Sequence, residues 1–368
     1  MTKTLIYQGL ATPASMGDFS ETEWDIVVRQ ARASGLLATL HYAAEEAGQL
    51  DRLPERVRVQ ITAARYVADH HREVMQWEVE ELHQILDRIG VPVIVLKGAA
   101  YVIARLEAAR GRLFGDIDIL VPRGALDEVE KALGRAGWVQ ESRNAYDDRY
   151  YRQWMHEIPA RRHTQRGTVL DVHHNILPLT ARHKPDARAL WDAARPVAGV
   201  NDLYVLSPED MLLHSASHLF CNGEFDRGLR DLNDFRRLSR EFDRTPEFWR
   251  GLQARAEVLN LGKPLDYAIR YANRLLDAGI QEDKPPSTLP FMDFLFMRGL
   301  GPNHSTAHDV WTPAALYALY VRGHYQRMPL GLLLPHLIYK GTLAKFQEQK
   351  LHDENEELLA QFRAFIGK

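Results

Sequence analysis

Cysteine is nearly absent from this sequence, with Cys221 the only one among 368 residues. A lone cysteine cannot form a disulfide within the chain, and this usage fits a reducing compartment. The first residues also lack the basic segment and apolar core of a secretory signal. These features predict a cytoplasmic protein.

Long apolar runs are missing as well. The best one, at residues 328–339, contains two prolines and one histidine. A membrane-spanning helix needs about 20 mainly apolar residues, so this run is too short. We therefore expect no transmembrane segment and no membrane partner.

The chain has no strong excess of charge of either sign. Its 46 lysines and arginines against 49 aspartates and glutamates leave a formal net charge of -3. Binding to the backbone of a long nucleic acid needs clustered Lys and Arg, and the sequence contains no basic tract. A long nucleic acid is therefore an unfavoured partner, and no feature indicates the oligomeric state.

What the chain does contain is 45% hydrophobic residues, enough for a substantial core. Apolar residues recur every three to four positions from about residue 18 to residue 90, which predicts helices. Three apolar runs, at 93–96, 111–121 and 167–177, then predict buried strands. The rest of the chain, after about residue 185, is again mainly helical in pattern.

The second of these runs, GRLFGDIDILV, places Asp116 and Asp118 two residues apart in an apolar strand. Side chains two residues apart on a strand point to the same face, so the two carboxylates project together. Burying an unpaired carboxylate is costly, which calls for a partner cation, a metal or exposure at a strand end. The alternative to a metal site is that the two aspartates are exposed acids at the end of the strand, with an ion pair to Arg112.

A further aspartate, Asp171, lies in the third run and can join the pair if the two strands are neighbours. Glu157 is the alternative candidate for the third acid. Three clustered carboxylates would repel one another and take up protons unless a cation neutralised them, and oxygen ligands alone favour Mg²⁺ or Mn²⁺ over zinc. His173 shares the predicted face of Asp171, where it would orient the carboxylate, contact a phosphate or simply pack at a domain junction.

Lys97 and Gly98 follow the first run directly. Glycine between a strand and a helix lets the backbone approach phosphates closely, and a helix N-terminus offers them free N–H groups. Two metal ions held by carboxylates would activate an attacking hydroxyl and stabilise the oxygen that leaves a phosphoryl group. Lys97 and Arg112 are therefore candidates to contact a triphosphate, with an ion pair to one of the acids as the alternative for each.

At these residues the sequence resembles the uncharacterised nucleotidyltransferase family of the polymerase-β-like superfamily. LKGAAYVIARLEAARGRLFGDIDILV, the amphipathic pattern after it and VLDVHH carry the resemblance over residues 88–178. Further along, LLHSASHLF and LRDLNDFRRL are similar to the helical region of the family. The resemblance implies an enzyme that uses Mg²⁺ or Mn²⁺ to move a nucleoside monophosphate from an NTP such as ATP to an acceptor.

Residue by residue, the resemblance assigns the phosphate-binding glycine to Gly98, the metal-binding pair to Asp116 and Asp118, and the third acid to Asp171. Two departures affect the expected substrate more than the fold. The usual Gly-Ser is here Lys-Gly-Ala, which removes the serine contact to phosphate. The step of 18 residues from Gly98 to Asp116 is also longer than in the smallest members of the superfamily.

The expected fold class is α+β, with a small mixed-sheet polymerase-β-like nucleotidyltransferase core between extensive helical regions. We expect an N-terminal helical region at 1–88, the core at 89–180 and a C-terminal helical region at 181–368. The last region would include a linker at 281–290 and a charged terminal helix at 345–365.

Four other residues have simpler explanations than a role in the site. His214 and His218 are four residues apart, a spacing that zinc can use, but without a third ligand in view we favour packing. Asp231 and Asp234 lie in an arginine-rich helical stretch, where exposure to solvent or ion pairs explain them better than a place in the cleft.

Two classes of function stay open. The first is nucleotidyl transfer to an unidentified acceptor, with a small molecule or a protein favoured over an RNA. The second is a catalytically silent nucleotide-binding protein or an antitoxin-like partner protein. The presence of all three acids favours catalysis, because a pure binding module would not need them.

Overall fold

The computed structural model describes residues 5–140, 154–281, 289–329 and 331. Helices surround one mixed sheet, so the predicted α+β class is confirmed. The expected terminal helix at 345–365 and most of the expected linker lie outside the described residues. A search of the described helices finds none with the length and apolar character needed to cross a membrane.

The sheet has seven strands in the order β3-β4-β5-β2-β1-β7-β6. In chain order their bounds are β1 (Val93–Leu96), β2 (Asp116–Leu120), β3 (Trp138–Gln140), β4 (Arg161–His163), β5 (Val169–His173), β6 (Arg195–Pro196) and β7 (Leu203–Val205). β2 pairs parallel with β5 and antiparallel with β1. The three predicted strands are therefore the three adjacent strands at the centre of the sheet.

Two strands lie where the sequence indicated mainly helices. β6 and β7 are only two and three residues long, too short to leave a periodic pattern. β7 is nevertheless the parallel neighbour of β1, with Ile94 opposite Tyr204. The sheet thus continues past residue 180.

The helices form three groups along the chain. Before the sheet come α1 (Leu5–Ala11), α2 (Glu21–Ala33), α3 (Leu37–Glu46) and α4 (Glu55–Asp87). Between the strands come α5 (Lys97–Ile103), α6 (Leu126–Arg135) and α8 (Ala187–Ala193). After the sheet come α9 (Pro208–Cys221), α10 (Gly228–Phe242), α11 (Pro246–Val258), α12 (Gly262–Leu276), α13 (Pro290–Gly299) and α14 (Thr312–Arg327).

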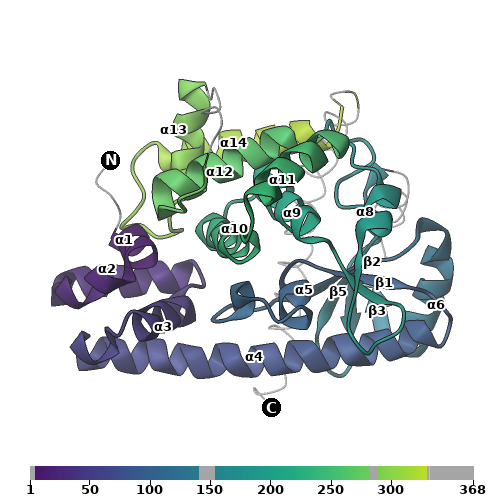
Figure 1. Cartoon of the computed structure of the whole chain (residues 1–368), viewed down its shortest axis with the longest axis horizontal. Helices are drawn as coiled ribbons and strands as arrows, with labels where there is room; N and C mark the ends of the chain where they lie inside the picture. Colours follow the sequence, from purple (N-terminus) through teal and green to yellow (C-terminus); the bar gives the residue numbers. More distant parts are fainter. Residues whose placement is uncertain (1–4, 141–153, 282–288, 330, 332–368) are drawn as a thin grey trace, which may run out of the picture.

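Figure 1 shows α4 running along one long side of the molecule. α1, α2 and α3 lie beside one half of it, and the sheet with α6 lies beside the other half. The helices after the sheet form the opposite side, where α9 packs on α5 and α10. α9 and α10 therefore face the region where β1 ends and β2 begins.

The central strands are anchored by buried apolar side chains. All four residues of β1 are buried, and so are Ile117 and Ile119 of β2. Apolar strands covered on both faces are typical of the centre of a sheet packed between helices. The polar residues of the site are therefore attached to a fixed hydrophobic core.

Candidate active site

Asp118 and Asp171 lie side by side on neighbouring strands. β2 and β5 pair in parallel with these two residues directly opposite each other. Side chains two residues apart share a face, so His173 projects with Asp171. One ligand atom from each of Asp118, Asp171 and His173 lies within 4.8 Å of the other two. The structure thus brings together three of the residues singled out in the sequence.

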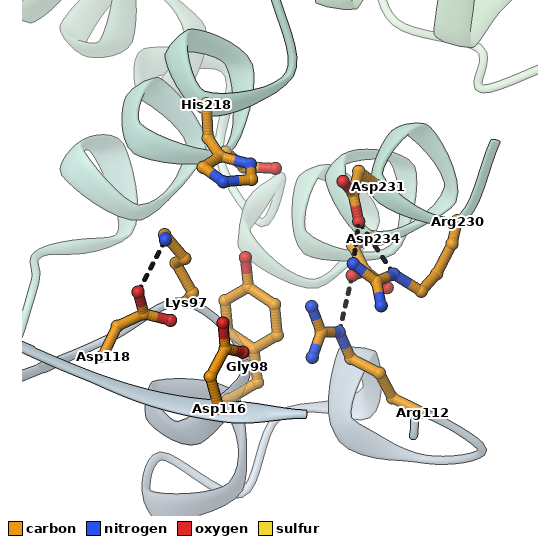
Figure 2. A pocket seen from close by; sticks show the side chains of 11 residues that line it. Lys97, Gly98, Arg112, Asp116, Asp118, His218, Arg230, Asp231 and Asp234 are labelled. Atoms are coloured by element: carbon orange, nitrogen blue, oxygen red, sulfur yellow. Dashed lines mark hydrogen bonds and ion pairs between the residues drawn. The ribbon is translucent and has the colours of Figure 1, made fainter. Parts of the chain in front are cut away.

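Asp116 lies at the start of β2, opposite Val169. It is exposed, whereas Asp118 is buried, so the two residues differ in environment although they share a face. Figure 2 shows the Asp116 carboxylate directed into a pocket that Asp118 also borders. Asp116 is thus nearest to solvent among the three acids, where an incoming ligand meets it first.

Lys97 is paired with Asp118. Its Nζ donates a hydrogen bond to Oδ1 of Asp118 over 2.6 Å, within the pocket shown in Figure 2. The Lys97 backbone has φ 47°, in the left-handed region that residues other than glycine rarely adopt. Of the two sequence-based explanations for this lysine, the ion pair to an acid is the one present in the structure.

The charges around Asp118 keep it ionised. Burial alone would raise the pKa of its carboxyl group, but Lys97 and His173 together lower it far below the usual range. Nε2 of His173 lies 3.0 Å from the same Oδ1 that Lys97 contacts. Burial lowers the pKa of His173, and the hydrogen bond to Asp118 raises it above its ordinary value.

Within the described part of the chain, neither Asp171 nor Asp116 has a cation paired with it as closely as Lys97 is with Asp118. Burial, followed by repulsion from Asp118 and Glu157, raises the pKa of Asp171 to about 7. Although the Asp116 residue is exposed as a whole, its carboxyl group is partly desolvated in the pocket, and this desolvation together with repulsion from Asp118 raises its pKa. The cluster therefore has more negative charge than its own cations neutralise, which is the electrostatic setting of a divalent-cation site.

The pocket beside Asp116 is closed by residues of α5, α9 and α10. Six of its lining residues were not proposed as site residues from the sequence: Tyr101, Ser215, His218, Arg230, Asp231 and Asp234. The spacing of Ser215 with His218, and of Asp231 with Asp234, puts each pair on one helix face. This spacing was visible in the sequence, but which helix faces the sheet was not.

Arg112 contacts α10 and neither of the acids on β2. Its Nε donates to Oδ2 of Asp234 over 2.8 Å, so the expected alternative pairing with Asp116 or Asp118 is wrong. Arg230 pairs with its neighbour Asp231 at 2.6 Å. Asp231 and Asp234 of α10 both line the pocket, and each is paired with an arginine. The structure thus shows both features that the sequence offered as alternatives, an ion pair and a place in the cleft.

Packing gives a second reason for a glycine at position 98, besides the phosphate contact that its position predicts. A Cβ atom added to it would lie 2.1 Å from Nη1 and 2.9 Å from Cζ of Arg112. The absent side chain therefore makes room for the Arg112 guanidinium over the start of α5. Gly98 still borders the pocket together with Lys97 and Arg112.

A second pocket, of about 330 Å³, shares Asp116 with the first. It lies between α4, which contributes His70, His71 and Val74, and the loop before β5, which contributes Arg166 and Thr168. Pockets that hold small ligands start at about 300 Å³. Asp116 therefore lines both the polar pocket beside Lys97 and this larger cavity beside α4.

Glu157 and the α9 histidines were weaker candidates from the sequence. Oε2 of Glu157 lies 3.2 Å from Nδ1 of His173, so this residue contacts the histidine and not the aspartates. His214 is buried, and His218 lines the pocket. Burial lowers the pKa of both imidazoles, that of His218 to about 3, so both are neutral at physiological pH.

Comparisons with known proteins give one matching family. Residues 20–277 match the model of a family described as uncharacterised nucleotidyltransferase. Among solved structures, the chain is similar to an antigenic nucleotidyltransferase-like protein from Paracoccidioides brasiliensis, at 15% sequence identity and a TM-score of 0.29. That similarity covers 52% of this chain and 91% of the other. No curated protein matches the chain.

Proposed function

Because the chain belongs to the uncharacterised nucleotidyltransferase family, we propose that it is an enzyme that transfers a nucleoside monophosphate from an NTP to an acceptor. The resemblance recognised in the sequence is confirmed by the family match, which covers more than half of the chain. The acceptor we favour is a small molecule or a protein side chain.

The observation that carries this proposal is the arrangement of Asp116, Asp118 and Asp171. Two of these acids are in register on parallel strands, and the third borders the same pocket as Lys97 and Gly98. Nucleotidyl transfer needs clustered oxygen ligands next to a place where phosphates can bind. The three acids would supply the metal ligands, and the pocket beside them, lined by Lys97, Gly98 and Arg112, would bind the phosphates.

The three carboxylates fit Mg²⁺ or Mn²⁺ by their chemistry and by their charge. Desolvation, and after it repulsion from Asp118, raises the pKa values of Asp116 and Asp171, and a divalent ion would offset that repulsion. When bound, the metal would lower the pKa of the acceptor hydroxyl and stabilise the charge on the departing pyrophosphate.

The cationic residues of the pocket would position the NTP. Lys97 borders the pocket and can contact phosphate oxygens from there. Arg112 lies over Gly98 and is bonded to Asp234 through Nε, so its other guanidinium nitrogens would be the ones to contact phosphate. His173 would hold Asp118 in place, since its Nε2 is 3.0 Å from the carboxylate.

The cavity next to α4 supports a small acceptor group. In-line transfer places the attacking and the leaving oxygen on opposite sides of the phosphorus. Asp116 borders both pockets, so a triphosphate in one and an acceptor in the other would meet at this carboxylate. A cavity of about 330 Å³ suits a metabolite or a single side chain better than a nucleic acid duplex.

Incubation of the protein with α-labelled NTPs, Mg²⁺ and a cell extract tests the proposal. We expect label to move to an acceptor, whose mass class distinguishes metabolite, protein and RNA. Asp116→Asn and Asp118→Asn should each lower the transfer rate at least about 100-fold, since even residues that only support metal ligands cost 10–100-fold. Asp87→Asn, at an exposed position that ends α4, is the control and should keep full activity. Full activity of the Asp118→Asn protein would rule the mechanism out.

One observation favours the alternative of a silent nucleotide-binding protein. Lys97 already neutralises Asp118, as a metal ion would. Calorimetry with each NTP, with and without Mg²⁺, separates the two functions. Nucleotide binding without transfer to any component of the extract would support the silent form.

A further inference from the structure

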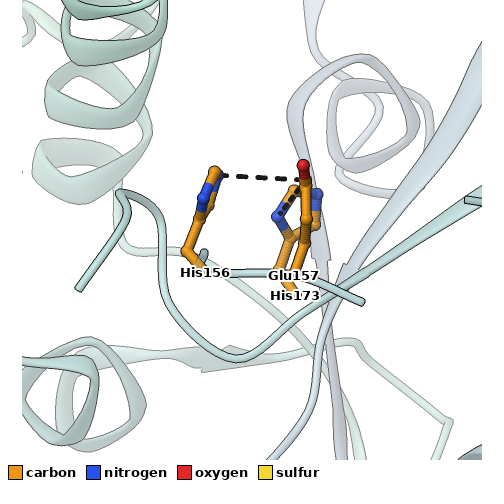
Figure 3. A group of neighbouring side chains, drawn as sticks. All are labelled: His156, Glu157 and His173. Carbon is orange, nitrogen blue, oxygen red and sulfur yellow. Dashed lines mark ion pairs between the residues drawn. The ribbon is translucent and has the colours of Figure 1, made fainter. Parts of the chain in front are cut away.

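A second group of potential metal ligands shares His173 with the group of Asp118 and Asp171. His156, Glu157 and His173 form it, and Figure 3 shows their side chains gathered together. His156 and Glu157 belong to the segment before β4, whereas His173 ends β5. The two segments are joined by an antiparallel bridge between Glu157 and His173.

The backbone holds these three residues in a fixed arrangement. The N–H of Ile158 donates to the carbonyl of Val172 over 3.0 Å, and the N–H of His174 donates to the carbonyl of His156 over 2.7 Å. The side chains are 14%, 20% and 2% exposed for His156, Glu157 and His173. The group is therefore rigid and largely buried, but solvent can reach it from the side of Glu157.

The distances within the group suit a single ion. Oε2 of Glu157 lies 3.2 Å from Nδ1 of His173 and 3.9 Å from Nε2 of His156. Metal–ligand distances of about 2.0–2.2 Å in tetrahedral geometry place ligand atoms about 3.4 Å apart. Both distances to Glu157 are within about half an ångström of this value, and all three ligand atoms lie within 4.8 Å of one another.

His173 is also oriented as metal-bound histidines are. Its Nε2 contacts the Asp118 carboxylate, which directs Nδ1 toward Glu157 and His156. Nδ1 is buried and makes no well-aligned hydrogen bond to a described residue, although Oε2 of Glu157 lies 3.2 Å away. A histidine that donates one ring N–H to a carboxylate and leaves the other nitrogen free is the usual arrangement at metal sites.

We propose that His156, Glu157 and His173 bind a divalent transition-metal ion of the zinc type. Two imidazole nitrogens and one carboxylate oxygen form a ligand set that binds zinc in proteins, with a fourth position open to water. Oxygen-only ligands distinguish the aspartate site from this one, which favours a softer ion. Through His173, the ion would fix the position of Asp118.

A direct ion pair between His173 and Glu157 is the competing explanation. It would account for the distance of 3.2 Å, but it gives His156 no role. It also predicts no affinity of the group for a metal. Metal binding without nucleotide therefore separates the two explanations.

The experiment uses untagged protein freed of metal with a chelator, and titrates it with Zn²⁺ and with Co²⁺. We expect about one equivalent of Zn²⁺ to bind, and Co²⁺ to give the visible absorption of nitrogen ligation. His156→Ala and Glu157→Gln should each weaken binding at least about ten-fold, because even residues that only support ligands cost 10–100-fold. His83→Ala, whose ring contacts the carbonyl of Asn201, and Glu128→Gln, exposed on α6, are the matched controls.

A further variant distinguishes metal binding at the aspartates from metal binding at His156, Glu157 and His173. Asp116→Asn alters the proposed nucleotidyl-transfer site and should leave the Co²⁺ spectrum unchanged. Binding that survives in His156→Ala and Glu157→Gln but is lost in Asp116→Asn would overturn the proposal, as would the absence of Zn²⁺ binding to the parent protein. Both readouts are independent of transfer activity, so a failure of the proposed enzyme function would not affect them.

Discussion

At the scale of single residues, two neighbouring aspartates on one sheet face have opposite electrostatic environments. Asp118 is held ionised by Lys97 and His173, which lower its pKa against the effect of burial. Asp171, directly opposite, has its pKa raised to about 7 by burial and by Asp118. Lys97 thus compensates the charge of Asp118, and the charge of Asp171 is the one that the proposed metal ion would neutralise.

The raised pKa of Asp171 predicts a stability that depends on pH. An unfolded aspartate has a pKa of about 3.9, so between about pH 4 and pH 7 the folded protein binds more protons at Asp171 than the unfolded chain does. The contribution of Asp171 to the free energy of unfolding of the metal-free protein should therefore fall as the pH rises through this window, and the difference between the parent and Asp171→Asn isolates it from the buried histidines, which titrate with the opposite sign. Asp171→Asn removes the titration, and at pH 8 the variant should gain a few kcal/mol at most relative to the parent, at about 1.4 kcal/mol per pKa unit.

Urea unfolding at pH 4.5 and pH 8 in the presence of a chelator measures this effect. Asp87→Asn, exposed at the end of α4, should follow the parent protein at both pH values. Identical pH dependence in the parent and in Asp171→Asn would show that Asp171 titrates normally. Mg²⁺ should bind more tightly above pH 7, because a protonated Asp171 is a poor ligand.

At the scale of elements, α5 and α10 are connected through one arginine. Arg112 lies in the loop before β2, passes over Gly98 at the start of α5 and bonds Asp234 on α10. Its side chain is 13% exposed and that of Asp234 is 7% exposed. A buried ion pair of this kind is costly to break when one partner is displaced.

Gly98→Ala is expected to displace Arg112. The new Cβ would lie 2.1 Å from Nη1 of Arg112, so the guanidinium must move away from Asp234. We expect a loss of about 1–3 kcal/mol in the free energy of unfolding, measured with urea. Gly134→Ala is the matched control, since a Cβ there meets nothing within 4 Å on exposed α6 and should stabilise by about 0.5–1 kcal/mol. Equal effects of the two substitutions would contradict this account.

At the scale of the whole molecule, one continuous core joins the sheet to the helices on both sides. The C-terminal helices are attached to the site through α9, which supplies Ser215 and His218 to the pocket. α14 packs against the end of α9. The two backbones approach each other closely where Gly323 of α14 contacts Gly223, just after α9. The position of α9 over the sheet therefore depends on a contact far from the acids.

Gly323→Ala should disturb this crossing. Its Cβ would lie 2.4 Å from the carbonyl oxygen of Asn222 and 2.5 Å from Cα of Gly223, and backbone atoms cannot move aside as a side chain can. We expect thermal and urea unfolding to show a loss of about 2–4 kcal/mol. Gly251→Ala on α11, where a Cβ meets nothing within 4 Å, is the control. A neutral Gly323→Ala would mean that α14 does not press on the end of α9.

The local sequence pattern predicted the three central strands of the sheet and missed the two strands at one of its edges. The β-branched run of β1 and the alternation of β2 and β5 are short-range signals, and all three strands were found. β6 and β7 were missed because two and three residues form strands only when a neighbouring strand is present. The partner of Arg112 was missed because Asp234 is 122 residues away in the chain.

The sequence by itself determined the chemistry at the sheet: which residues are acids, that Asp116 and Asp118 share a face, and which family the chain resembles. These properties follow from side-chain identity and from a strand period of two, which act over a few residues. Only the tertiary structure decided that Lys97 pairs with Asp118, that Arg112 turns to α10, and that His156 and Glu157 meet His173. Such contacts depend on how strands and helices pack, and neither composition nor periodicity encodes that arrangement.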